Sequence, residues 1–230
     1  FRPSGALEIR QAGNEFDKMR KRIMRHLNQR SEMLSGISHD LRTPLTRMKL
    51  QLAFIKDKEI SSKMSLDIDD MEQMLNEYLQ FTSSSYSESD VTFDISELIS
   101  DIVQKYKNNN ISSNLQTGVV INGRKNLIER SINNLIDNSI KFADKINIKL
   151  SNKNNSLLIT IDDNGPGIPK EEYENVFKPF YKIDKSRNAS KSSVGLGLSI
   201  ASDIIKSHGG NILLEKSPLN GLRVKVFLPV

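Results

Sequence analysis

Hydrophobic side chains recur at helical spacing along the first third of the chain. Apolar positions are separated by three or four residues over 34–55, and the same spacing returns over 64–78. Such heptad-like seams are typical of amphipathic helices that pack along one face. We therefore expect one helix over about 4–56, a short polar break at 57–62, and a second helix that folds back against the first.

Two amphipathic helices alone cannot enclose a hydrophobic core. Pairing of two such hairpins, each from one copy of the chain, produces a four-helix bundle in which all the seams are buried. The pattern of the first third therefore predicts a homodimer.

The periodicity changes after a serine-rich polar stretch at 83–90, which we interpret as a linker. Helical spacing returns at about 95–107, 124–142 and 196–207, and short apolar runs predict strands at 91–93, 119–121, 146–150, 157–161, 212–215 and 223–228. Because no helix separates the third strand from the fourth, or the fifth from the sixth, the sheet must be antiparallel or mixed. We expect an α+β domain in which the polar stretch 182–194 forms a lid.

The composition narrows the class of protein. The chain has 230 residues, a net charge of +5 and no cysteine, which excludes disulfides and thiolate metal sites and favours a reducing compartment. The basic excess gathers at 18–25, where a solvated helix face is the preferred interpretation and a membrane-proximal collar the next. No groove-reading motif accompanies it, so we expect no direct contact with nucleic acid. No run of 18 apolar residues occurs, and the chain begins with Phe1, which indicates a fragment; a membrane segment upstream of it stays open at this point.

One histidine combines the features of a nucleophile. His39 lies within the first helical pattern but off its apolar seam, so we expect it to face water. Asp40 follows it directly, Thr43 lies one helical turn on, and Pro44 removes the helix hydrogen bond to the Asp40 carbonyl. A solvated imidazole beside a carboxylate, in a weakened helix, indicates chemistry performed on the histidine itself.

A second group of polar side chains shares one face of the helix expected at 124–142. Asn134, Asn138 and Lys141 are four and three residues apart, so they lie on the same face. Amide oxygens are hard ligands that suit Mg²⁺, and a lysine can neutralise phosphate. A merely solvated helix face is the alternative for this group taken alone.

Two Gly-x-Gly turns complete the candidate chemistry. A strand runs into Asp163, followed by Gly165 and Gly167, and a carboxylate at a strand end can accept a hydrogen bond from an exocyclic amine such as adenine N6. Gly195 and Gly197 open the last helix, where free N–H groups can hold an anion. An ordinary tight turn is the alternative for the first of them, and the second is weak evidence when taken alone.

The order of these groups along the chain resembles the sensor histidine kinases of two-component systems. That family shows H, N, G1, F and G2 sequence boxes, which match, in order, His39 to Pro44, Asn134 to Asn138, Asp163 to Gly167, Phe177 to Phe180, and Gly195 to Gly197. The stretch around His39 is especially similar to osmosensing members, and 5–27 is similar to the second helix of a HAMP signal-relay module. For the phenylalanine pair we favour a hydrophobic anchor over a contact with ligand.

The resemblance implies a fold and three regions. These are part of a HAMP helix at 1–27, a dimerisation and histidine phosphotransfer hairpin at 28–85, and an ATP-binding domain with the Bergerat α/β-sandwich fold at 86–230. The fold class is thus α + α+β, a dimeric four-helix bundle followed by the ATP-binding sandwich.

The resemblance also implies residue roles. His39 is the expected phosphoacceptor, Asp40 the base that orients its ring, and Thr43 the residue that positions a water to dephosphorylate a response regulator. The expected ATP-binding residues are Asn134, Asn138, Lys141, Phe142, Asp163, Gly165, Gly167, Ile168, Lys182, Gly195, Leu196 and Gly197, and Asn138 is also the expected Mg²⁺ ligand. Gyrase-like ATPases carry a water-activating glutamate where Asn134 stands. Because asparagine cannot activate water in this way, bound ATP is expected to keep its γ-phosphoryl group until His39 accepts it.

The family implies partners as well. These are a second copy of the chain, an OmpR-like receiver domain of a response regulator and an upstream transmembrane sensor, with this chain as the cytoplasmic portion of a bacterial inner-membrane protein. Ser193 replaces the first glycine of the family's G2 box. A degenerate kinase that serves as a nucleotide-binding scaffold therefore stays open as an alternative, and so does a simple ATPase.

Overall fold

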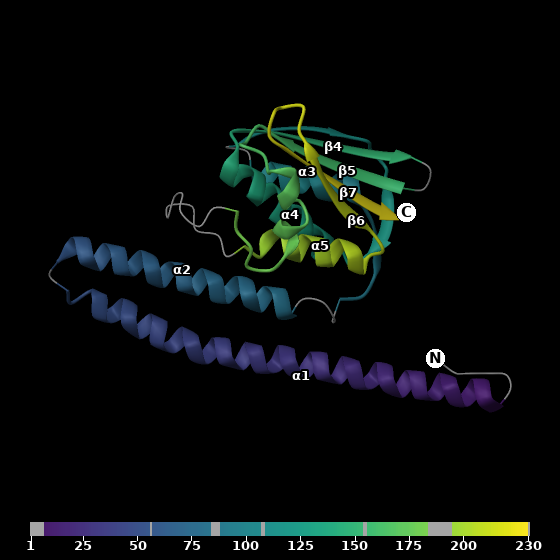
Figure 1. The fold of residues 1–230 in the computed structure, drawn as a ribbon, viewed down its shortest axis with the longest axis horizontal. Helices are drawn as coiled ribbons and strands as arrows, with labels where there is room; N and C mark the ends of the chain where they lie inside the picture. The colour runs from purple at the N-terminus through teal and green to yellow at the C-terminus, as the bar shows by residue number, and fades with distance from the viewer. Residues whose placement is uncertain are drawn as a thin grey trace. The chain divides into compact units, whose positions relative to one another are not determined.

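The computed structural model describes residues 7–55, 57–83, 88–106, 109–153, 156–183 and 195–229, without the side chains of a few helical residues. The chain divides into two compact units, Phe1–Tyr86 and Ser87–Val230. The first is a helical hairpin and the second an α/β unit (Figure 1). Across these ranges, no helix has an apolar stretch long enough to cross a bilayer.

The helical unit consists of α1 (Leu7–Leu52) and α2 (Lys58–Ser83). Both helices are predicted by the sequence, but the polar break expected at 57–62 is wrong by several residues. The reason is a helix cap: Asp57 Oδ1 accepts hydrogen bonds from the N–H groups of Glu59 (3.0 Å) and Ile60 (3.1 Å). A carboxylate at this position lets α2 begin earlier than its apolar seam does.

The two helices contact each other through few buried apolar side chains. Leu45, Leu52 and Ile68 are buried, with Leu75 partly buried against them. Lys49 Nζ adds ion pairs to Asp69 (2.6 Å) and Glu72 (2.7 Å) across the hairpin. Other seam positions remain exposed in the single copy, namely Ile37, Leu41, Met48, Ile55, Met64 and Met71.

The α/β unit is built on a five-stranded sheet in the order β2-β4-β5-β7-β6. Its strands are β2 (Asn110–Leu115), β4 (Lys145–Lys153), β5 (Ser156–Asp163), β6 (Asn211–Lys216) and β7 (Leu222–Pro229). β2 pairs with β4 in parallel and every other pair is antiparallel, so the sheet is mixed. The sequence did not predict β2, because its Asn-Ile-Ser-Ser-Asn-Leu segment has almost no apolar signal.

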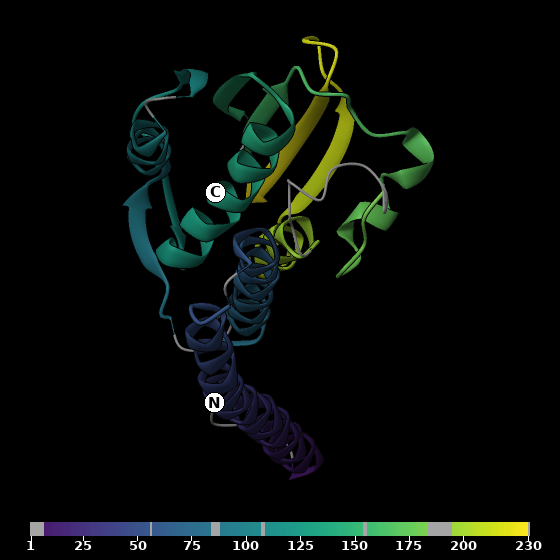
Figure 2. The ribbon, with the colours of Figure 1, turned by 90° about the vertical axis from the view of Figure 1, so that its left-hand side faces the viewer.

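Helices cover one face of this sheet. α4 (Lys125–Phe142) and α5 (Gly197–Ser207) contact it, and α3 (Ile95–Lys105) lies beside α4 (Figure 1, Figure 2). A two-stranded ladder of β1 (Val91–Asp94) and β3 (Val120–Gly123) and two short 3-10 turns, η1 (Lys170–Glu172) and η2 (Asn175–Phe177), complete the unit.

The core of the α/β unit lies between the helices and the sheet. Alternate residues of β5 point to it, and Ile148, Ile159, Ile161 and Ile136 have no exposed surface. Tyr106 ties α3 to α4 through a 2.6 Å hydrogen bond to Asp137. Burial, and then this carboxylate, raise the pKa of Tyr106, so its hydroxyl remains a donor. The core therefore holds α4 in a defined position on the sheet.

Candidate functional site

The segment around His39 lies in the middle of α1. The backbone of His39 is helical, and its side chain is outside the described part of the structure. Asp40 and Thr43 are both exposed on the same helix. The Arg42 guanidinium reaches across the hairpin and donates a 3.1 Å hydrogen bond to Asn76 Oδ1. This segment of α1 therefore presents a carboxylate and a hydroxyl to solvent.

Pro44 lies inside α1 without interrupting it. Proline cannot donate to the Asp40 carbonyl, which removes one helix hydrogen bond. Two residues on, the Thr46 hydroxyl donates a 3.0 Å hydrogen bond to the Arg42 carbonyl, a local contact of the kind that threonine makes within helices. The helix then continues to Leu52, so the weakened turn just after His39 does not end it.

α4 carries the second group of candidate residues. Asn134, Asn138 and Lys141 lie on this helix, each partly buried. The Asn134 Nδ2 atom is buried and has no hydrogen-bond partner among the described residues. A buried amide without an acceptor is costly, and a bound acceptor such as a phosphate oxygen would satisfy it. One turn earlier on the same stripe lies Arg130, whose pKa is lowered by burial; sequence reasoning did not single it out.

The end of α4 meets the turn that follows β5. Ser139 Oγ lies 3.4 Å from Asp163 Oδ2, and a Cβ added to Gly165 would lie 2.9 Å from the Phe142 carbonyl oxygen. Phe142 is 48% exposed. The structure thus brings the C-terminal end of α4, just after the predicted N box, against the predicted G1 box, and glycine at 165 permits the close approach.

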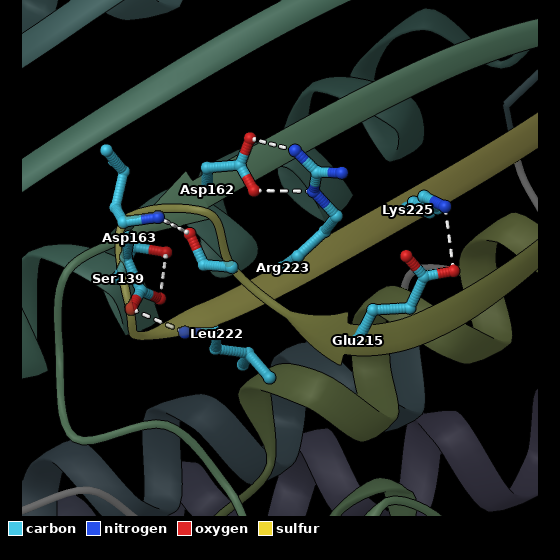
Figure 3. Close-up of polar contacts among 9 residues, drawn as sticks. Ser139, Asp162, Asp163, Glu215, Leu222, Arg223 and Lys225 are labelled. Carbon is cyan, nitrogen blue, oxygen red and sulfur yellow. Dashed lines mark hydrogen bonds and ion pairs between the residues drawn. The ribbon is translucent and has the colours of Figure 1, made fainter.

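Asp163 is buried and held by backbone donors. Its Oδ1 accepts hydrogen bonds from the N–H groups of Gly165 and Leu222, both at 2.9 Å. Figure 3 shows the contact with Leu222. Gly167 adopts a left-handed φ of 71°, which glycine tolerates, and Ile168 packs partly buried against the core. The turn that carries the carboxylate is therefore well defined.

The neighbouring carboxylate faces the other side of the sheet. Asp162 forms a two-point ion pair with Arg223, at 2.7 Å to Nε and 2.9 Å to Nη2 (Figure 3). The hydrogen bond with Asp162 raises the pKa of Arg223, so the pair remains charged. Consecutive residues of β5 are thus each held by β7.

The third group lies at the two ends of the segment expected to form a lid. Gly195 accepts a 3.0 Å hydrogen bond from the Phe180 N–H and adopts a φ of 79°. Leu196 is fully buried, and Gly197 begins α5 with its Cβ position 3.9 Å from the Asn134 carbonyl oxygen. The start of α5 and the middle of α4 are therefore neighbours.

The phenylalanine pair and the segment expected to form a lid agree only in part with the predictions. Phe177 packs against the core as an anchor, but Phe180 is 55% exposed, so the expected paired anchor is wrong for Phe180. Lys182 is exposed. Residues 184–194, which include Ser193 and most of the expected lid, lie outside the described residues.

A separate polar hollow of about 470 Å³ lies near the start of α4 and contains none of the predicted nucleotide residues. It is lined by Glu88, Ser89, Asp90, Asn122, Arg124, Ser207 and His208. The Glu88 carboxylate accepts hydrogen bonds from the N–H groups of Asn126 (2.8 Å) and Leu127 (3.2 Å). The end of the expected linker is therefore tied to α4 as a helix cap.

Sequence reasoning missed the contribution of β7 to this site. The sequence predicted a strand at 223–228 without a role in the site, and Ser139 was not among the predicted site residues. Leu222 acts through its backbone N–H, which carries no side-chain signal. The signal for Ser139 was available, because it follows Asn138 directly and lies one helical turn before Phe142.

Two family models match separate parts of the chain. Residues 29–86 match the His Kinase A (phospho-acceptor) domain. Residues 123–230 match the histidine kinase-, DNA gyrase B-, and HSP90-like ATPase family. The first match contains the exposed Asp40 and Thr43, and the second contains α4, β5, α5 and β7.

Curated relatives match over nearly the whole chain. The sensor histidine kinase GtrS of Pseudomonas aeruginosa is 31% identical over 227 residues, 98% of this chain and 47% of that protein. The sensor histidine kinase CpxA of Escherichia coli is 30% identical over 241 residues, 99% of this chain and 53% of that protein. The chain spans about half the length of the curated relatives it matches.

Solved structures of histidine kinases share the fold. Full-length ShkA in complex with AMPPNP has a TM-score of 0.67 at 20% identity, over 86% of this chain and 45% of that one. The ATP binding domain of PrrB from Mycobacterium tuberculosis has a TM-score of 0.50 at 28% identity, over 62% of this chain and 98% of that one.

Proposed function

The chain belongs to the sensor histidine kinases of two-component systems, and we propose that it transfers the γ-phosphoryl group of ATP to His39. From there the group passes to an aspartate of a response-regulator receiver domain. The observation that carries this proposal is the convergence in the α/β unit. Asn134, whose buried Nδ2 atom has no hydrogen-bond partner in the described part of the chain, lies beside the start of α5, while Asp163 lies beside the end of α4.

The first step is a phosphoryl transfer with a balanced exchange of bonds. One imidazole nitrogen of His39 attacks the γ-phosphorus, the bond from that phosphorus to the β–γ bridging oxygen breaks, and ADP leaves. Asp40, the next residue, orients the ring and takes the proton from its other nitrogen. Asn134 has no basic group to activate water, so the phosphoryl group is retained for His39. Alignment and charge neutralisation supply most of the catalysis in such a step.

We assign the parts of ATP to the residues that the fold brings together. Asp163 accepts from the adenine amino group, Phe142 packs by the base, and the polar side chains of α4 face the phosphates. Base-pocket residues are Asp163, Phe142, Gly165, Gly167 and Ile168; phosphate residues are Asn134, Lys141, Lys182, Gly195, Leu196 and Gly197. The free N–H groups at the start of α5 suit an anion.

Mg²⁺ would be held by Asn138 together with nucleotide oxygens. One hard amide oxygen from the protein suits this ion, which usually keeps several waters and shares phosphate oxygens. When bound, the ion neutralises charge on the phosphates. Asn138 is partly buried on the stripe of α4 that carries Asn134, so its position fits this role.

The wider assignments rest on the family. We propose a HAMP helix at 1–27, a phosphotransfer hairpin at 28–85 and an ATP-binding domain at 86–230. The first partner is a second copy of the chain, which would cover the exposed seams of α1 and α2. The others are an OmpR-like response regulator and an upstream transmembrane sensor, which places this chain on the cytoplasmic side of the membrane.

Thr43, exposed one turn from His39, would position the water that dephosphorylates the regulator.

Incubation of the full chain with γ-labelled ATP tests the proposal. We expect acid-labile, base-stable label on the wild-type chain and none on His39→Gln. Thr43→Ala, an exposed change on the same helix, should retain the label and weaken dephosphorylation of the regulator. Nucleotide binding without label would favour a scaffold, and steady phosphate release without label would favour an ATPase. Either result would overturn the kinase proposal.

A further inference from the structure

Two consecutive carboxylates of β5 are held by two consecutive residues of β7. The backbone ladder between these strands ends at the pair Asp162 and Arg223. Beyond it, the Leu222 N–H donates to the Asp163 side chain, at 2.9 Å, instead of to a backbone carbonyl of β5 (Figure 3). The side chain of Asp163 therefore takes the acceptor place at the end of the ladder, and its orientation depends on the register of β7.

Gly221, the residue before β7, packs directly on this carboxylate. A Cβ at position 221 would overlap Asp163 Oδ1, and would lie 2.5 Å from both the Asp163 carbonyl oxygen and the Gly165 amide nitrogen. Real Cβ atoms essentially never approach other atoms so closely, and two of the three are backbone atoms. Any side chain at 221 must therefore displace the turn that carries Asp163.

The turn before β7 is braced against such a displacement. The Ser217 N–H donates to the Gly221 carbonyl at 2.9 Å, and the Asn220 N–H donates to the Ser217 carbonyl at 3.0 Å. Ser217 is itself buried, and its hydroxyl accepts from the Leu219 N–H at 3.0 Å. The two-point ion pair of Arg223 with Asp162 holds the other side. Strain introduced at 221 is consequently passed to Asp163.

We propose that Gly221, Leu222 and Arg223 form a positioning clamp that sets the selectivity of the nucleotide site for adenine. This rests on the proposed function, in which Asp163 accepts from the adenine amino group. Oδ1 already accepts from two backbone N–H groups, so Oδ2 is the oxygen oriented toward the base, with Ser139 Oγ 3.4 Å away. The three clamp residues act through Asp163 and are not themselves catalytic.

The test compares two nucleotides on the full chain. ATP and purine riboside triphosphate differ only in the 6-amino group, and calorimetry gives both dissociation constants. A hydrogen bond to a charged group predicts that the wild-type chain binds ATP at least about tenfold more tightly. Gly221→Ala should reduce the ratio of the two dissociation constants to at most about threefold, mainly because the variant binds ATP more weakly.

Gly210→Ala is the matched control. A Cβ at 210 would overlap the Phe227 carbonyl oxygen of β7, so it crowds the backbone of the same sheet, but between β6 and β7 and away from Asp163. We expect Gly210→Ala to lower the melting temperature while the ATP ratio stays at the wild-type value. Equal loss of the ratio in both variants would show general loosening and would overturn the clamp.

A second variant covers the case in which Gly221→Ala does not fold. Asp162→Asn combined with Arg223→Gln removes the ion pair without leaving a lone buried charge. The ratio should then fall by about threefold, while a change equal for both nucleotides, or no change, would refute the positioning role. The two hypotheses fail in distinguishable ways.

If the wild-type chain does not prefer ATP at all, the role of Asp163 assigned in the proposed function is wrong. If the wild-type chain prefers ATP and both Gly221→Ala and the double variant keep that preference, only the clamp is wrong.

Discussion

The two units of the chain bury their apolar side chains to very different extents. In the α/β unit, Ile136, Ile148 and Ile161 have no exposed surface and belong to a continuous core. In the helical unit, the described core consists of Leu45, Leu52 and Ile68. The α/β unit is complete in one copy, whereas the hairpin has the surface of half a bundle.

This difference separates two physical roles. A unit that closes its own core can hold a ligand site to a defined geometry, as the contacts of Asp163 illustrate. A hairpin that leaves Met64 and Met71 exposed gains stability from association, because apolar burial contributes roughly 25 cal/mol per Å². We therefore expect the helical unit to respond to dimerisation and the α/β unit not to.

The largest expected effect is a cavity in the self-contained core. Ile148→Ala should lower the free energy of unfolding of the α/β unit by about 2–5 kcal/mol, because the core cannot collapse fully around the deleted atoms. Leu66→Ala, at a position that is 62% exposed on α2 and off its seam, should change stability by at most about 0.5 kcal/mol. Urea unfolding measures both. Comparable losses would mean that the two units do not differ in this way.

The next effect should appear at the exposed seam. Met71 is 53% exposed in one copy and lies on the α2 seam. Met71→Lys should raise the dissociation constant of the dimer by at least about tenfold, since a buried methionine contributes roughly 1.5–3 kcal/mol. Sedimentation equilibrium measures it, with Leu66→Lys as the off-seam control. An unchanged dimer in Met71→Lys, or equal weakening in both, would contradict a seam-to-seam interface.

The smallest expected effect is a pH-dependent change in stability at a helix cap of the α/β unit, compared with a helix cap of the helical unit. The hydrogen bond from the Ser96 side chain, followed by the N–H groups of Ser96 and Glu97, lowers the pKa of Asp94 from 3.8. Because the folded pKa lies below the unfolded one, the carboxylate stabilises the fold above about pH 3.8, and this is lost as the pH falls through the folded pKa.

Asparagine keeps the cap acceptor but removes the charge, so Asp94→Asn should cost about 0.3–1 kcal/mol at pH 7 and little at pH 2. Melting curves across that range measure the difference between the two chains. Asp57→Asn, at the exposed cap of α2, is the matched change in the helical unit and should leave the melting of the α/β unit unchanged at each pH. A constant difference between Asp94→Asn and the wild-type chain would contradict a titrating cap.

Local patterns predicted most of the elements and the family. Helical spacing predicted the five α-helices, and short apolar runs predicted six of the seven strands that the structure describes, because buried positions of these elements are apolar. The site residues on α4 could be placed on one face for the same reason. β2 shows no such pattern, because its side chains are mostly polar and it pairs at the edge of the sheet.

By itself, the sequence determined the α-helices, all strands but β2, their order and the chemical groups that they carry. Only the tertiary structure decided which distant groups meet: Leu222 N–H with Asp163, Gly221 against the same carboxylate, and Glu88 at the start of α4. The physical reason is that these contacts depend on strand register and on backbone donors. A backbone N–H is the same in nearly every residue, so no side-chain pattern announces where it will donate.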